Sequence, residues 1–449
     1  MAFAYYRITG DATKLTFADI VGAIIMGSVS TLMIFYSISG FLLRILLLLK
    51  NRFYRNINAF TFRQISSRIN TMVVSMTLIC LMLFVTICTL SASFAIRDTF
   101  NRDFDRYCRA DMQVIYRSSD GVNKKIEDIY AEKDADLQNL LSDKTDFYIY
   151  EDEGVTYSCL LNGVVEATNM NNNAPLWMMK ESDYCRLMAL YGLPVTRVSE
   201  GKYLIIANLV TDYFNQAMEN RNEINVDGQT LLPQQTTCID TPIQLATQAD
   251  EGGTLVVKDK VLDKARKVAE VFTGNYKADN STDRHNIENK LRAAQEKIKA
   301  DNANDNYRGL MLNTRIDIGE ASIGISALFT FLGLYIGIVF LLACGALLAL
   351  KGLSDNVDSI PRYQILRKIG VEERDINRSL FIQTGTFFLL PLLLALVHSI
   401  FGIRFAENFT QFAGIRNLTS SYGITAIMVL VIYGGYFAIT YFTGKEVIK

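Results

Sequence analysis

The segment KGLSDNVDSIPRYQILRKIGVEERDINRSL, residues 351–380, carries the residues of this sequence with the clearest potential for recognition chemistry. A helix that begins near Pro361 and ends at Gly370 would have an apolar side and a basic side. An amphipathic helix of this kind can fill a groove on a partner protein. An ordinary basic loop next to a membrane would have a similar composition, and the pattern alone favours neither. The candidate contact residues are Arg362, Tyr363, Leu366, Arg367 and Lys368.

Catalytic and cofactor-binding patterns are missing from the sequence. It has no G-x-x-x-x-G-K-[S/T] loop for phosphates, no H-E-x-x-H motif and no G-x-S-x-G motif. Of the two histidines, His285 falls in a predicted polar helix and His398 in an apolar run. We expect His398 to contact headgroups or a neighbouring helix rather than to react. The expectation is therefore no enzyme activity, no cofactor, no metal site and no nucleic-acid partner.

The elements that would position the basic segment are long apolar runs. Half of the 449 residues are apolar, and they gather in five runs. Each run is about as long as the roughly 20 residues that cross a bilayer. The sequence therefore predicts five transmembrane helices, in residues 18–50, 71–96, 321–350, 379–403 and 424–443.

The distribution of Lys and Arg predicts an orientation in the cell membrane. Basic residues are concentrated in residues 351–378, the predicted cytoplasmic coupling loop, and in residues 51–70, a predicted amphipathic helix on the cytoplasmic surface. The amino terminus would then lie outside and the carboxyl terminus in the cytoplasm. The other predicted segments are a short extracellular segment (1–17), an extracellular domain (97–320), an extracellular loop (404–423) and a cytoplasmic tail (444–449).

Residues 97–320 are expected to fold as a large domain that mixes helices and strands. They hold 27 Lys and Arg against 37 Asp and Glu, a net charge of about −10. The acidic excess would attract a cationic ligand, or it serves solubility alone. Alternating and apolar runs predict strands at 112–117, 146–151, 203–208 and 253–258. Capping residues and periodicity predict helices at 182–192, 211–221 and 282–302.

Four cysteines fall in this predicted outer domain, where an oxidising exterior would permit disulfides. Four cysteines allow three pairings, and their spacing selects none of them; all four free is equally open. The residues are Cys108, Cys159, Cys185 and Cys238.

At this point a family resemblance adds weight to the basic segment. RYQILRKIGV, followed by LLPLLLALVHSIFGI and IYGGYFAITYF, resembles the carboxyl-terminal part of FtsX-like ABC transporter permeases. More narrowly it resembles permeases of the bacitracin-type peptide-antibiotic resistance and sensing systems. FRQISSRINTMVVSMTLICLMLFVTICTLS and SDYCRLMALYGLPVTRVSEGKYLIIAN are similar to that family too.

The resemblance implies a polytopic α-helical membrane protein, an FtsX-like, type VII ABC permease, with a large mixed α/β extracellular domain. It implies that residues 359–371 contact a separate ATPase subunit, with Arg362, Tyr363, Leu366, Arg367 and Lys368 as the ATPase-coupling residues. It also implies a peptide antibiotic or cell-wall lipid precursor as ligand, and a membrane histidine kinase as a further partner. ATP hydrolysis would move the extracellular domain, which releases or senses antibiotic–lipid complexes.

One departure from the family concerns the number of spans. Its members carry two FtsX-like units and about ten spans, whereas five are predicted here. We therefore expect a truncated or split permease that needs a second permease half, with another copy of this chain as the alternative. Two other functions use similar features: an ATP-independent signalling or scaffold protein acting on a sensor kinase or cell-wall hydrolase, and a lipoprotein-extraction permease.

Overall fold

The computed structural model describes residues 2–8, 16–48, 57–118, 122, 124–164, 173–301, 309–410 and 422–449. The chain divides into two compact units. The helical unit holds residues 1–97, 327–410 and 416–449, and the sheet domain holds residues 98–326 with 411–415.

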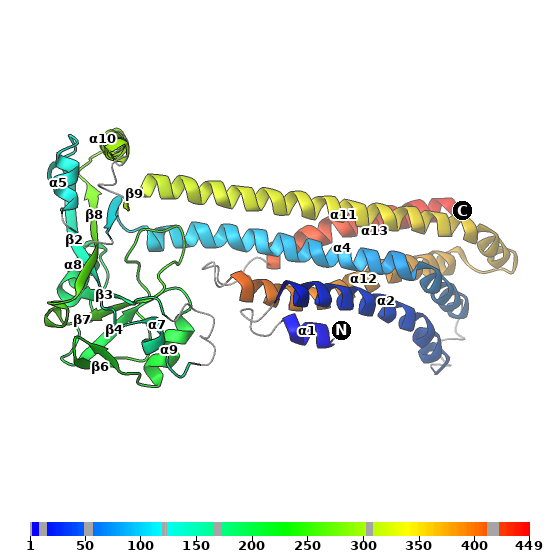
Figure 1. Ribbon diagram of the computed structural model, residues 1–449. Helices are drawn as coiled ribbons and strands as arrows, with labels where there is room; N and C mark the ends of the chain where they lie inside the picture. Colours follow the sequence, from blue (N-terminus) through cyan, green and yellow to red (C-terminus); the bar gives the residue numbers. More distant parts are fainter. Residues whose placement is uncertain are drawn as a thin grey trace. The chain divides into compact units, whose positions relative to one another are not determined.

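Long apolar helices build the helical unit (Figure 1). Five of them are long and apolar enough to cross a membrane. Each predicted span falls largely within one of these helices. The unit's helices are α1 Ala2–Ile8, α2 Phe17–Leu48, α4 Asn58–Tyr107, α11 Arg315–Lys368, α12 Glu373–Thr410 and α13 Tyr422–Val447.

Two helices continue through positions where the sequence suggested a boundary. Residues 58–70, expected in a separate surface helix, are the first turns of α4, which contains no Gly or Pro that would end it. Residues 51–56 of that expected helix lie outside the described residues. Pro361 was expected to start a helix but lies inside α11. Proline removes one helical hydrogen bond, and here α11 is held on both sides of it by buried residues, Ser359 and Tyr363.

The core of the helical unit is made by α4, α11, α12 and α13. Each of these helices contributes large buried side chains to the core, and Phe35 of α2 adds one more. Examples are Met76 and Leu83 of α4, Leu341 of α11 and Tyr433 of α13. The Tyr433 hydroxyl donates to the carbonyl of Phe388, 3.0 Å away, so the one polar atom of that ring is satisfied inside the core.

The sheet domain is built on one nine-stranded mixed sheet with the order β5-β6-β4-β7-β3-β2-β8-β1-β9. Most neighbours are antiparallel, whereas β3 pairs in parallel with β7 and β4 with β6. The strands are β1 Met112–Arg117, β2 Leu141–Glu151, β3 Trp177–Lys180, β4 Lys202–Ile206, β5 Ile224–Val226, β6 Gln229–Pro233, β7 Thr254–Val257, β8 Arg266–Tyr276 and β9 Leu310–Thr314.

Both faces of the central strands are buried. Along β4, Tyr203 and Ile205 belong to one apolar cluster, and Leu204 and Ile206 to another. Side chains alternate between the faces of a strand, so a strand covered on both sides needs a continuous apolar run. This requirement explains the run YLII in the sequence.

Helices cover the sheet and fill these clusters. They are α5 Ile126–Ala131, α6 Leu137–Leu140, α7 Tyr157–Leu160, α8 Glu181–Leu190, α9 Thr211–Glu219, the short 3-10 helix η3 Asp259–Leu262 and α10 Ser281–Asp301. The predictions for β1, α8, α9 and α10 are confirmed to within two residues, and the predicted strands at 146–151, 203–208 and 253–258 correspond to parts of β2, β4 and β7.

Candidate coupling site

The predicted coupling residues lie in the last two turns of α11, which end in a glycine cap. Gly370 has a φ of +85°, a backbone conformation that favours glycine. The Val371 N–H donates to the Leu366 carbonyl (3.1 Å) and the Gly370 N–H to the Arg367 carbonyl (3.0 Å). This is the Schellman pattern, and Val371 also packs against Leu366, as that motif commonly shows. The end of the helix is therefore fixed by local structure.

Tyr363 and Leu366 are buried within the chain. They share an apolar cluster with Ile376 and Leu380 of α12 and with Ile448. Tyr363 has no exposed surface, and its ring makes an edge-to-face contact with Phe60 of α4, with centroids 5.7 Å apart. These two side chains hold the end of α11 against its neighbours.

A buried polar network supports the same end of the unit. Gln383 of α12 donates to the Tyr363 hydroxyl (3.2 Å) and to the Ser379 hydroxyl (3.0 Å). Ser379 in turn lies 2.7 Å from the Thr61 hydroxyl of α4. The network joins α4, α11 and α12 by directional contacts, which fix their relative rotation more strictly than apolar packing does.

Arg68 and Arg362 connect α11 to the start of α4. Arg68, nearly fully buried, donates to the Asp355 carbonyl and the Ser359 hydroxyl, both 2.8 Å away. Arg362 donates to the Gln64 side chain at 2.8 Å. The predicted basic side of the segment is thus partly used inside the chain.

Arg367 makes the ion pair that closes the turn between α11 and α12. Its guanidinium contacts both carboxylate oxygens of Glu373, at 2.5 and 3.3 Å, and donates to the Ile448 carbonyl at 2.7 Å. A fork of this kind fixes orientation as well as charge. Because Glu373 is exposed, its energetic contribution is modest.

The exposed residues of this helix end include two apolar side chains and one basic side chain. Ile365 and Ile369, one turn apart, are 59% and 70% exposed. Lys368 is exposed between them and makes no ion pair or hydrogen bond to the described residues. We call Ile365, Lys368 and Ile369 the coupling face.

The structure therefore divides the five predicted residues. Lys368 belongs to the coupling face, whereas Tyr363 and Leu366 hold the helix in place. Arg362 and Arg367 are engaged by Gln64 and Glu373. Ile365 and Ile369 are not among the five predicted residues, since periodicity cannot tell which half of the apolar side the neighbouring helices cover.

His398 has the structural environment that was expected for it. Its Nδ1 is hydrogen-bonded to the hydroxyl of Tyr5 in α1, and its Nε2 lies 3.1 Å from the Thr31 hydroxyl of α2. The Phe84 ring of α4 makes an edge contact with the imidazole, with ring centroids 5.8 Å apart. His398 thus links α12 to three other helices.

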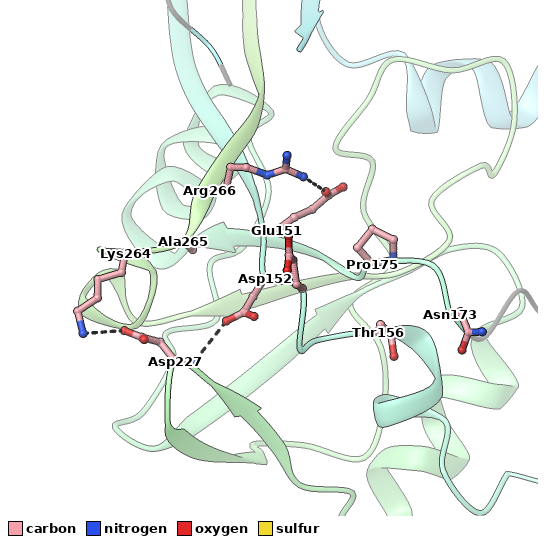
Figure 2. Close-up of a pocket in the computed structure, with 10 residues that line it drawn as sticks. Glu151, Asp152, Thr156, Asn173, Pro175, Asp227, Lys264, Ala265 and Arg266 are labelled. Atoms are coloured by element: carbon pink, nitrogen blue, oxygen red, sulfur yellow. Dashed lines mark hydrogen bonds and ion pairs between the residues drawn. The ribbon is translucent and has the colours of Figure 1, made fainter. Parts of the chain in front are cut away.

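The sheet domain contains a cleft of about 550 Å³, a size typical of ligand sites (Figure 2). Its charges are mostly paired with each other: Glu151 with Arg266 at 3.3 Å and Asp227 with Lys264 at 3.4 Å. Asp152 accepts from the Gly154 N–H at 2.8 Å. This internal pairing leaves no side chain that identifies a ligand.

All seven cysteines are free. The candidates differ in environment: Cys108 is buried, Cys185 and Cys238 are half-buried and Cys159 is exposed. A hydrogen bond with the Thr156 hydroxyl lowers the pKa of the Cys159 thiol from its usual value. Cys159 is therefore the most reactive of the four towards thiol reagents.

Curated proteins related to this chain are permeases. The ABC transporter permease protein YxdM of Bacillus subtilis is 33% identical over 100 residues, which is 22% of this chain and 16% of that protein. The bacitracin export permease protein BceB of the same organism is 29% identical over 140 residues, 30% of this chain and 20% of that protein. The ABC transporter permease YvcS is 26% identical over 123 residues, 27% and 18% of the two chains.

These matches are partial. The chain spans no more than a fifth of the length of the curated relatives that it matches. No protein-family model matches it. One solved structure, from Bacillus anthracis, aligns with 38% of this chain and 85% of its own at 10% identity and a TM-score of 0.22, too weak to carry an argument. Over the matched segments, the chain is related to ABC transporter permeases, including those of the bacitracin type.

Proposed function

We propose that this chain is the permease component of an ABC transporter, with a separate ATPase that docks on the coupling face. The observation that carries the proposal is the coupling face itself: two exposed isoleucines and an exposed lysine at the end of a helix whose buried side packs against α4, α12 and α13. Exposed apolar side chains next to a basic one favour contact with a partner protein.

The length of α11 supports a mechanical role. It is one continuous helix from Arg315, directly after β9, to Lys368. A helix of 54 residues is about 80 Å long at 1.5 Å per residue. A displacement at the coupling face would therefore be carried along a stiff element to the residues that join the sheet.

The proposal includes the orientation and the ligand class. The coupling face and the carboxyl terminus would lie in the cytoplasm, and the sheet domain and the amino terminus outside, as the Lys and Arg distribution predicts. A peptide antibiotic, alone or with a cell-wall lipid precursor, is the proposed ligand, in line with the name of the related bacitracin export permease. A second permease half, or another copy of this chain, would complete the pathway, and a membrane histidine kinase is a further proposed partner.

Co-purification with a candidate ABC ATPase subunit from the same organism tests the proposal. The full chain and the ATPase would be expressed together and purified in a gentle detergent. The molecular mass of the complex would then be measured. We expect Ile369→Asp and Lys368→Glu each to weaken the complex about tenfold or more, which corresponds to about 1.4 kcal/mol. Glu446→Lys, at an exposed site near the end of α13, is the matched control and should have no effect.

Two results would count against the proposal. One is a chain that purifies without any ATPase, even when the two are expressed together. The other is an ATPase complex that persists unchanged in the Ile369→Asp and Lys368→Glu variants. The second result would keep a role in transport but remove the coupling face from it.

A further inference from the structure

Within the sheet domain, the end of α4 and the start of α11 leave the sheet at adjacent strands. α4 ends at Tyr107 and β1 begins at Met112, while α11 begins directly after β9. β1 and β9 are antiparallel neighbours, with Met112 opposite Thr314. The two helices are thus connected to the sheet at neighbouring positions.

Glu288 of α10 is the centre of a buried polar cluster at this place. It is 3% exposed and accepts hydrogen bonds from the Tyr276 hydroxyl of β8 and the Thr314 hydroxyl of β9, both at 2.5 Å. The Arg292 guanidinium lies 3.1 Å from the same carboxylate. Three donors from three elements therefore meet at one buried acid.

Arg292 extends this cluster to the first turn of α11. Its guanidinium also pairs with Asp317 at 2.7 Å. The Asp317 N–H donates to the Thr314 hydroxyl oxygen at 3.1 Å, so Thr314 caps the helix. Burial raises the pKa of the Tyr276 hydroxyl, and the neighbouring Glu288 and Asp317 carboxylates raise it further. The hydroxyl therefore stays protonated and remains a hydrogen-bond donor. Thr314 contacts both α10 and α11, and Arg292 connects its own helix, α10, to α11.

Arg315 connects the same turn to the end of α4. It donates to the Cys108 carbonyl and pairs with Asp105 at 2.7 Å. Its guanidinium also lies over the Phe104 ring, 4.9 Å from the centroid. A Cβ at Gly319 would approach that ring to 3.2 Å, which shows how closely α11 passes α4 here.

We propose that Glu288, Arg292, Thr314 and Asp317 form a rigid joint that makes α10 and the strands beside it follow α11 when that helix moves. Arg292 is the positioning residue, because its guanidinium is the one cation among the four and it pairs with a carboxylate on each helix. The proposal rests on the proposed function for the origin of the movement, but the rigidity of the joint is a property of this chain alone.

The other ion pairs of α10 provide the contrast. Lys297 pairs with Asp134 at 2.7 Å, and both side chains are more than half exposed. This pair links α10 to a loop and does not involve α11. Loss of the Lys297 pair removes one ion pair from the same helix and leaves the joint intact, so Lys297→Ala is the matched control.

Distance measurements between spin labels test the joint in the full chain in lipid nanodiscs. Labels at Ala293→Cys in α10 and Glu320→Cys in α11 would be placed in a Cys159→Ser background, since both positions are exposed. The parent should give one narrow distance distribution. We expect Arg292→Ala to broaden it at least twofold, Glu288→Gln to broaden it less, and Lys297→Ala to leave it unchanged.

Arg292→Lys provides a conservative variant that keeps one contact, and it should restore much of the narrow distribution. Equal widths in the parent, Arg292→Ala and Glu288→Gln would overturn the joint, as would equal broadening by Lys297→Ala. No ATPase takes part in this measurement. A chain that fails to bind an ATPase but shows the expected widths would therefore contradict the proposed function and leave the joint standing.

Discussion

Tyr363 of α11 and Ile369, which directly follows that helix, lie six positions apart and have opposite environments. Tyr363 is enclosed by α4 and α12, and its ring packs in an apolar cluster, whereas Ile369 is 70% exposed. Burial of an aromatic ring stabilises the fold, while an exposed isoleucine contributes almost nothing to it. The two residues therefore serve different purposes at one site.

Substitution of these two residues separates their roles. Tyr363→Ala would leave a cavity among Leu366, Ile376 and Leu380, and should lower the free energy of unfolding by about 3 kcal/mol or more. Tyr363→Phe should lose only the Gln383 hydrogen bond, about 1 kcal/mol. Ile369→Ala should change stability by less than about 0.5 kcal/mol. Thermal unfolding in detergent measures all three, and equal losses at both positions would contradict the assignment.

Glu270 of β8 predicts a pH dependence of the sheet domain. Burial, with a smaller effect of Asp146, raises its pKa to about 7, although it accepts a hydrogen bond from the Ile126 N–H at 3.1 Å. Between its ordinary pKa of 4.5 and about 7, the folded domain holds a proton that the unfolded chain has lost. The free energy of unfolding therefore decreases as the pH rises through that window.

Glu270→Gln removes this titration and keeps an acceptor for the Ile126 N–H. We expect the stability of the variant relative to the parent to be greater at pH 8 than at pH 5, by on the order of 2 kcal/mol. Chemical denaturation of both proteins at the two pH values gives the difference directly. A difference that is the same at pH 5 and pH 8 would show that Glu270 does not titrate in this range.

At the scale of elements, α4 and α11 approach each other through glycines. A Cβ at Gly337 of α11 would lie 2.7 Å from the Leu90 side chain of α4, and one at Gly333 would overlap Ser93. Small residues at a helix contact let two backbones come close, as is usual between helices in membranes. These two glycines are one turn apart and therefore lie on the same side of α11.

Replacement of glycine by alanine should lower stability at Gly333 of α11, where α4 is close, but not at Gly434 of α13. Gly333→Ala places a methyl group inside the Ser93 side chain and should lower the free energy of unfolding by about 1–3 kcal/mol. Gly434→Ala in α13 meets no atom within 4 Å and should be neutral or raise it by up to about 1 kcal/mol. Melting temperatures measured in the same detergent compare the stability of the two variants. A loss of stability in Gly434→Ala equal to that in Gly333→Ala would contradict the close approach.

Elements with a strong local signal could be predicted from the sequence, and their partners could not. The apolar runs and the helical periodicity of α8, α9 and α10 depend on neighbouring residues, although α8 and α9 start without a side-chain cap. β8 has a mixed sequence, RKVAEVFTGNY, and was not predicted; its pairing with β1 joins residues about 160 positions apart. The joint around Glu288 was missed for the same reason, because Tyr276 and Thr314 reach it only through the sheet.

At the scale of the whole molecule, one helix contains both the residues of the joint that belong to α11 and the end that carries the coupling face. α11 begins at the joint beside β9 and ends at the coupling face, with no break between. The sequence predicted the apolar run but divided this helix at Pro361, since proline is more often found near a helix start than inside one. The proposed coupling rests on this continuity of α11.

The proposed orientation can be tested with thiols that the structure describes. Cys159 is exposed on the sheet domain and has a lowered pKa, so it should react with a membrane-impermeant maleimide added to intact cells. Lys368→Cys in a Cys159→Ser background places a single exposed thiol on the coupling face. We expect this thiol to react at least tenfold more after permeabilisation than before. Labelling of Lys368→Cys in intact cells, together with protection of Cys159 in the parent, would reverse the orientation and would move the coupling face to the side where no ATP is available to a partner ATPase.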